Sequence, residues 1–132
     1  MQVYTLVGKS GSGKSFHAME LCKKKQIDGI IDDGLFIYQN TIVAGVSAKR
    51  SQTKIGAVKV ALFLDSASCK EVKAAIEERQ PESILVLGTS VEMVDKIIRR
   101  LGLPMPEADS PRRIRIEDIT TEEERKVARQ QR

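Results

Sequence analysis

Apolar residues gather in short runs that alternate with segments of helical spacing. Three runs stop at a glycine or an aspartate and predict buried strands, at residues 3–7, 29–32 and 84–87. Elsewhere apolar side chains recur every three to four residues and predict helices, at residues 13–25, 68–79 and 91–101. This alternation is typical of a three-layer α/β/α sandwich with a mostly parallel sheet.

Two shorter apolar runs predict an additional hairpin. Residues 35–37 and 41–44 flank the triplet Tyr-Gln-Asn at positions 38–40. Asparagine tolerates a left-handed backbone conformation, so we expect a small β-hairpin whose turn includes Asn40.

The C-terminal part predicts one more strand and one more helix. Ile114 and Ile116 alternate with charged residues, which favours a half-exposed strand at an edge of the sheet. Thr120 and Thr121 each precede a glutamate by three residues, and this spacing offers two capping boxes for a final helix.

Residues 54–65 allow two interpretations. Apolar residues at helical spacing favour a helix, and they are Ala57, Val60, Ala61 and Leu64. The run VALFLD also has the form of a buried strand that ends in Asp65. The lysines at positions 54 and 59 favour the helix.

Composition indicates one soluble domain that spans residues 1–132. The 41% of hydrophobic and 30% of charged residues are ordinary for a globular protein. No apolar run approaches the roughly 18 residues of a membrane span, and the N-terminus lacks the basic leader of a signal peptide. We therefore expect a cytoplasmic protein without a membrane partner. Cys22 and Cys69 stand far apart and suggest no disulfide framework.

The net charge of +4 is unevenly distributed along the chain. Residues 1–60 hold more than twice as many basic as acidic side chains, whereas acidic residues dominate 61–98. This excess surrounds the N-terminal glycines and suits a polyanionic ligand of nucleotide size. The scarcity of aromatic residues disfavours nucleic acid as the partner.

The strongest motif is the run GKSGSGKS, which satisfies the spacing G-x-x-x-x-G-K-[ST] in full. Glycines allow successive backbone N–H groups to point inward and form a nest for phosphate oxygens, and the following helix adds its positive end. Lys14 is expected to reach the terminal phosphates, and Ser15 to coordinate Mg²⁺. The residues of this candidate nucleotide-binding loop are Gly8, Lys9, Ser10, Gly11, Ser12, Gly13, Lys14 and Ser15.

With this motif between a strand and a helix, the sequence resembles the P-loop NTPase superfamily. It is most similar to small folds of the nucleotide- or metabolite-kinase type, in which the loop lies close to the N-terminus. The specific match covers only residues 8–15, and the order of strands and helices extends it loosely over the chain. The resemblance implies binding of a Mg²⁺-nucleotide and names no acceptor. ATP is favoured over GTP, because the nearest candidate for a guanine-reading motif, residues 53–56, lacks its aspartate.

Three aspartates compete for the role of the acid near the metal. In small P-loop kinases the strand after the loop helix often ends in such an aspartate, a position that Asp32 and Asp33 occupy here. Neighbouring side chains at a strand tip point to opposite sides, so we expect at most one of the two to face the loop readily. Alternatively, Asp33 and Gly34 simply make a turn. Asp65 becomes a metal-binding residue if residues 60–65 form a strand, and a helix cap if they form a helix.

A basic cluster at Lys49, Arg50 and Lys54 lies on a polar segment. In P-loop enzymes a mobile lid can bring a cation such as Arg50 to the transferring phosphate. The alternative is a solvated basic loop. Thr89 and Ser90 follow a predicted strand, where parallel sheets present ligand contacts, although helix capping also explains them.

Three functions stay open on this basis. The chain is a Mg²⁺-dependent ATPase or small phosphotransferase, with Lys14, Asp32, Asp33 and Arg50 as candidate catalytic residues and Ser15, Asp32 and Asp65 as candidate metal ligands. Alternatively, it is a regulatory module that senses ATP and acts through a protein partner. A nucleic-acid-binding protein is the remote third.

Overall fold

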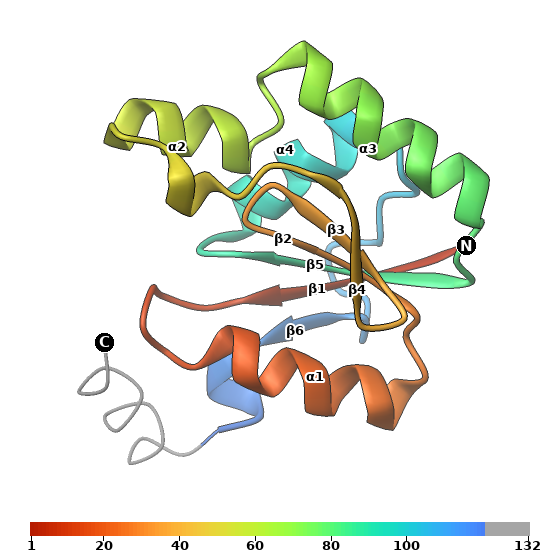
Figure 1. Cartoon of the computed structure of the whole chain (residues 1–132). Helices are drawn as coiled ribbons and strands as arrows, with labels where there is room; N and C mark the ends of the chain where they lie inside the picture. Colours follow the sequence, from red (N-terminus) through yellow and green to blue (C-terminus); the bar gives the residue numbers. More distant parts are fainter. Residues whose placement is uncertain (121–132) are drawn as a thin grey trace.

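The computed structural model describes residues 1–120, which form a six-stranded sheet with helices on both faces (Figure 1). The strands are β1 (Gln2–Val7), β2 (Gly29–Asp32), β3 (Leu35–Tyr38), β4 (Thr41–Gly45), β5 (Ser83–Gly88) and β6 (Arg113–Arg115). The helices are α1 (Lys14–Lys25), α2 (Lys54–Ala61), α3 (Ser66–Arg79) and α4 (Val91–Leu101), with short 3₁₀ turns η1 (Ala48–Arg50) and η2 (Ile116–Asp118). No helix within residues 1–120 is long and apolar enough to cross a membrane.

The sheet is mixed, and this corrects the expectation of a mostly parallel one. Its order is β4-β3-β2-β5-β1-β6. β2, β5, β1 and β6 pair in parallel, whereas β3 and β4 run antiparallel to their neighbours. The hairpin was correctly predicted, but a tight turn at Asp33-Gly34 lays β3 directly beside β2 and makes the hairpin part of the main sheet.

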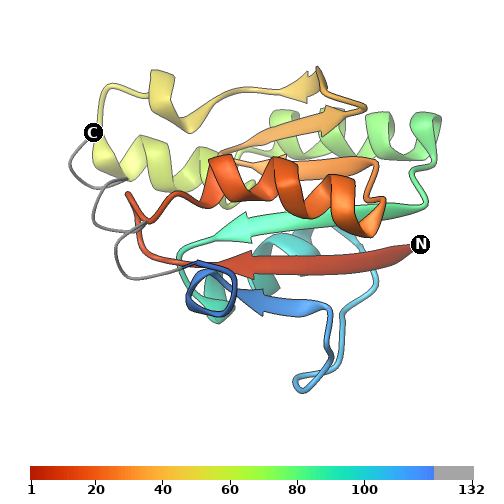
Figure 2. The ribbon, with the colours of Figure 1, turned by 90° about the horizontal axis from the view of Figure 1, so that it is seen from below.

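Two apolar cores lie between the sheet and the helices on its two faces. β5 is buried along its whole length, and its side chains alternate between the two cores. Ile84 and Val86 pack on the side of α3 and α4, and Leu85 and Leu87 pack on the side of α1. Figure 2, seen from below, shows α1 crossing this second face of the sheet.

Several local predictions are confirmed. Residues 54–61 form the helix α2, which Thr53 caps through a hydrogen bond from the Gly56 amide. Ser90 caps the N-terminus of α4. The hairpin turn holds Gln39 and Asn40 at positive φ.

The edge strand is shorter than predicted. Among the strands of residues 1–120, β6 pairs only with β1 and lies at the sheet edge, as expected. Ile116, however, belongs to η2 and is fully buried, because it packs against the loop where a Cβ on Gly8 would clash with it. The helix predicted after Thr120 lies outside the described residues.

Candidate functional site

Three parallel strands end at the same edge of the sheet. β1 and β5 run in register, with Val7 opposite Gly88, and β2 lies on the other side of β5. The Gly8 amide donates a hydrogen bond to the Gly88 carbonyl at 3.1 Å, which ties the two strand ends together. Ligands of open α/β sheets bind in the crevice outside such carboxyl ends.

The glycine-rich loop between β1 and α1 closes on itself. Gly11 and Gly13 have φ angles of 77° and 87°, which residues other than glycine rarely adopt. The amide and the hydroxyl of Ser12 both donate to the Lys9 carbonyl, at 3.2 and 2.6 Å. These contacts hold the loop in a compact curve at the start of α1.

The start of α1 supplies donors for an anion. Its first turn closes with a hydrogen bond from the His17 amide to the Gly13 carbonyl at 3.0 Å. The amides of Gly13, Ser15 and Phe16 donate no hydrogen bond to residues 1–120. Unpaired amides at the positive end of a helix bind phosphate or carboxylate groups well.

Lys14 lies over the loop instead of extending into solvent. Its Nζ donates hydrogen bonds to the carbonyl oxygens of Gly8 and Lys9, the latter at 3.1 Å. The ammonium group is therefore placed at the curve of the loop, next to the amides at the start of α1. Its charge adds to the field that attracts an anion there.

Ser15 and Asp32 meet beside the loop. The Ser15 hydroxyl donates a hydrogen bond to Oδ2 of Asp32 at 3.2 Å. Burial raises the pKa of the Asp32 carboxyl, while the Ser15 hydrogen bond and the nearby Lys49 and Lys14 partly offset this and the charge of Asp33 reinforces it. Because burial disfavours the charged form of Asp32, a cation beside its carboxylate would stabilise that form.

The donor set of this pair fits a magnesium ion bound together with phosphate. Mg²⁺ prefers oxygen ligands and commonly takes one or two from protein side chains, with phosphate and water providing the others. Ser15 and Asp32 present a hydroxyl and a carboxylate side by side. Residues 1–120 contain no group of three or more His, Cys, Asp or Glu side chains arranged to hold a metal.

Asp33 forms the predicted turn and also secures a neighbouring segment. It has a φ of 56° and precedes Gly34 at 88°. Its Oδ2 accepts a hydrogen bond from the Ser47 hydroxyl at 3.0 Å, and its carbonyl accepts one from the Ala48 amide at 2.9 Å. Asp33 thus holds η1, which contains Lys49, next to the glycine-rich loop.

The structure does not bring Asp65 to the loop. Its Oδ1 accepts a hydrogen bond from the Ala67 amide at 3.3 Å and caps α3. The metal-binding role required a strand at residues 60–65, and this segment instead contains the end of α2 and a turn. A helix advances only about 1.5 Å per residue, against about 3.3 Å for a strand, so the segment does not carry Asp65 to the strand ends.

A cavity of about 370 Å³ joins these groups. We call it the phosphate cavity; it is lined by Ser10, Gly11, Gly13, Lys14, Ser15, Phe16, Asp32, Asp33, Lys49, Leu87, Gly88, Thr89 and Met93. Of the basic cluster, Lys49 lines it and the candidate Arg50 does not. Thr89 was considered as a ligand contact from its place after a strand, with helix capping as the alternative, whereas no sequence signal pointed to Met93 or Phe16.

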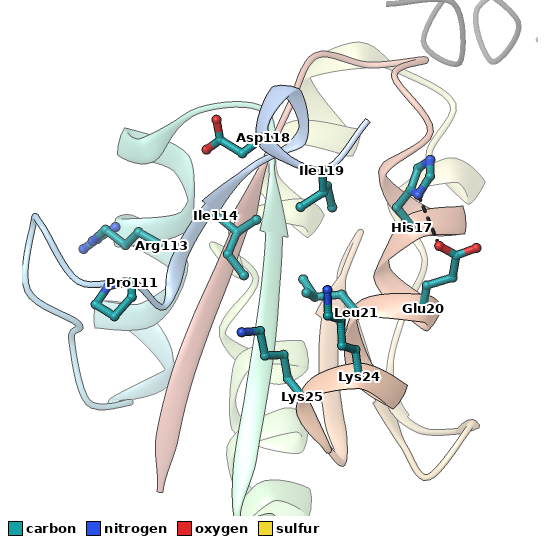
Figure 3. A pocket seen from close by; sticks show the side chains of 10 residues that line it. All are labelled: His17, Glu20, Leu21, Lys24, Lys25, Pro111, Arg113, Ile114, Asp118 and Ile119. Carbon is teal, nitrogen blue, oxygen red and sulfur yellow. Dashed lines mark ion pairs between the residues drawn. The ribbon is translucent and has the colours of Figure 1, made fainter. Parts of the chain in front are cut away.

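Another cavity, of about 400 Å³, lies between α1 and the β6–η2 segment (Figure 3). Lys24 and Lys25 reach from α1 toward β6, and His17 faces Glu20 at 3.6 Å. None of the predicted catalytic, nucleotide-binding or metal-binding residues lines it. We therefore place the candidate site at the phosphate cavity.

No family model matches the chain, and comparisons with curated proteins and with solved structures found no similar protein. The functional assignment therefore depends on the residues of the phosphate cavity themselves.

Proposed function

We propose that the chain binds a Mg²⁺-nucleoside triphosphate at residues 8–15, with ATP preferred over GTP, and cleaves or transfers its terminal phosphoryl group. The observation that carries the proposal is the hydrogen bond from Ser15 to Asp32 beside the glycine-rich loop. It combines the serine of the motif with a carboxylate that the motif does not contain. The preference for ATP rests on residues 53–56, where the aspartate of a guanine-reading motif is lacking.

Each group has a defined task under this proposal. The amides at the start of α1 and the ammonium of Lys14 hold the phosphates, which places negative charge where the helix and the lysine favour it. Ser15 and Asp32 hold Mg²⁺, whose charge neutralises phosphate oxygens. Lys49 faces the same cavity and stabilises charge on the transferring phosphoryl group.

A thermal unfolding assay with Mg²⁺-ATP tests this proposal. A ligand that binds only the native state adds about 2.7 kcal/mol to the free energy of unfolding at a hundredfold excess over Kd. Lys14→Ala should abolish this stabilisation, and Lys23→Ala, an exposed lysine on the same helix, should leave it unchanged. Stabilisation that survives Lys14→Ala would overturn the phosphate-loop assignment.

A second candidate function is a nucleotide sensor that acts through a protein partner. It is favoured by α2, which contains no buried residue and exposes 72% of Ile55 and 54% of Val58. Exposed apolar side chains of this kind are suited to a partner surface. ADP release distinguishes the two functions, because a sensor binds ATP without appreciable turnover and an enzyme converts it.

A further inference from the structure

A third cavity, of about 570 Å³, opens beside the phosphate cavity between α2, η1 and α4. We call it the α2–α4 pocket. The two cavities share four lining residues, which are Asp33, Lys49, Thr89 and Met93. A ligand in the α2–α4 pocket would therefore lie next to one in the phosphate cavity.

The walls of the α2–α4 pocket are chiefly apolar. They are formed by Ala57, Val58, Ala61 and Leu62 of the α2 segment and by Met93 of α4. Glu92 and Lys96 also line it and pair with each other at 3.2 Å, so together they add no net charge to the lining. Apolar walls with a few convergent polar groups, in a volume of several hundred Å³, are typical of sites for small organic molecules.

Polar groups concentrate on the boundary between the two cavities. Asp33 and Lys49 place a carboxylate and an ammonium there. One carboxylate oxygen of Asp33 accepts a hydrogen bond from the Ser47 hydroxyl, and the carboxylate can accept further hydrogen bonds. A hydroxyl group is well suited to this boundary, because it can donate to Asp33 while its oxygen faces the phosphate cavity.

We propose that the α2–α4 pocket binds a phosphoryl acceptor, a small organic molecule with an apolar body and a hydroxyl group directed at Asp33. This inference rests on the proposed function of the phosphate cavity. The acceptor oxygen forms a bond to the terminal phosphorus of ATP, and the bond from that phosphorus to its bridging oxygen breaks. The bridging oxygen keeps the electron pair and leaves as part of ADP, and the hydroxyl proton is released to solvent.

Amide shift mapping on ¹⁵N-labelled full-length protein, with benzyl alcohol as the probe, tests this pocket. We expect saturable shifts at the amides of Ala57, Ala61 and Met93. Ala61→Trp places a large ring in the pocket and should weaken binding at least about tenfold. Ile55→Trp, the same insertion on the exposed side of α2, should leave binding within about twofold of wild type.

Other outcomes would overturn the inference. Shifts that fail to saturate, or that Ala61→Trp and its replicate Ala57→Trp leave unchanged in folded protein, would show that the pocket does not bind the probe. Adenosine producing the same shifts more strongly would assign the pocket to the nucleobase. Benzoate binding more tightly than benzyl alcohol would replace the hydroxyl-bearing acceptor with an anion.

Lys14→Ala separates this inference from the proposed function. The variant should lose stabilisation by Mg²⁺-ATP yet bind benzyl alcohol as the wild type does, because Lys14 does not line the α2–α4 pocket. If wild-type protein binds benzyl alcohol in the pocket but shows no response to Mg²⁺-ATP, the proposed function fails, and with it the acceptor role. If it responds to Mg²⁺-ATP but not to the probe, only the acceptor pocket fails.

Discussion

The Ser15 hydroxyl donates a hydrogen bond to Oδ2 of Asp32 across a sequence separation of 17 residues. Ser15 lies in the first turn of α1, and Asp32 is the last residue of β2. The bond therefore connects the glycine-rich loop with a strand that is not its direct neighbour in the sheet. Under the proposed function, these two oxygen groups would bind the same Mg²⁺ ion.

Ser15→Ala should reduce the Mg²⁺-dependent part of ATP binding. Loss of a hydrogen bond or ligand contact to a charged group corresponds to about 1.5–3 kcal/mol, or about 10- to 100-fold in Kd. Titration calorimetry of ATP with Mg²⁺ and with EDTA measures this difference. Ser15→Thr retains the hydroxyl and serves as the control. An alanine variant with the Mg²⁺ response of the wild type would contradict a metal role for Ser15.

Asp32→Asn should raise the melting temperature of the Mg²⁺-free protein at pH 7. The pKa of Asp32 is raised in the folded state, chiefly by burial, so the folded state favours the protonated carboxyl. Wild-type stability therefore falls as pH rises through this pKa, whereas the asparagine variant has no such loss. Calorimetry in EDTA should show the two melting temperatures converging as the pH falls to about 4 or below. Parallel profiles from pH 4 to 7 would contradict the prediction.

Lys49→Ala should lower ADP formation by about 10- to 100-fold, because the lysine lines the phosphate cavity beside Asp32 and Asp33. Its neighbour Arg50 does not line this cavity, so Arg50→Ala is the matched control and should stay within about twofold of wild type. A coupled assay of ADP release measures both variants. Equal losses would indicate that the general charge of η1 is responsible, and not the position of Lys49.

Arg113→Met should destabilise the fold strongly. The Arg113 guanidinium donates to Oδ1 of Asp95 at 2.9 Å and to the carbonyls of Pro106 and Glu107, both at 3.0 Å. Its side chain is only 13% exposed, and that of Asp95 is 21% exposed. Removing one partner of a fully buried ion pair lowers the free energy of unfolding by about 3–5 kcal/mol. Because this pair is partly exposed, we expect a loss of about 2–4 kcal/mol.

The control for this change lies on the same strand. Arg115 pairs with Asp118 at 3.6 Å, and their side chains are 68% and 54% exposed. Exposed pairs contribute about 0–1 kcal/mol, so Arg115→Met should be nearly neutral in urea unfolding. Equal midpoints for the two variants would mean that the Arg113 network does not hold the 106–113 connection.

Cys22 should react slowly with alkylating agents at pH 8. Burial, and after it the charge of Asp28, raises the pKa of its thiol to about 11. About 0.1% of the thiol is then ionised at pH 8, and reactivity should rise about tenfold per pH unit toward pH 10. Iodoacetamide labelling of a Cys69→Ala variant, followed by intact mass, measures Cys22 alone. Rapid labelling that does not change with pH would contradict the raised pKa.

Local patterns predicted most of the elements. The glycine and asparagine positions, the helix cap at Ser90 and the spacing of α2 depend on neighbours within a few residues, so the sequence shows them directly. The preference for a helix was also correct for residues 54–61, and the absence of a strand at residues 60–65 removed the basis for a metal role of Asp65.

Long-range relationships were not predictable in the same way. The mixed sheet arises because β3 folds back on β2, and the full burial of Ile116 arises because η2 packs under Gly8. The choice of Asp32 over Asp33 depends on which side chain faces α1, and the choice of Lys49 over Arg50 depends on how Asp33 holds η1. Met93 lines the phosphate cavity only because α4 begins at the same sheet edge as the loop.

By itself, the sequence determined the glycine-rich loop, its setting between a strand and a helix, and a short set of acids and bases that could accompany it. The features of such a loop are local, since they depend on consecutive amides, two positive-φ glycines and a helix start. Only the tertiary structure decided which carboxylate joins Ser15 and which lysine faces the cavity, and only it revealed the adjoining apolar pocket. These features depend on strand order and helix packing, which bring together side chains that are distant in the chain.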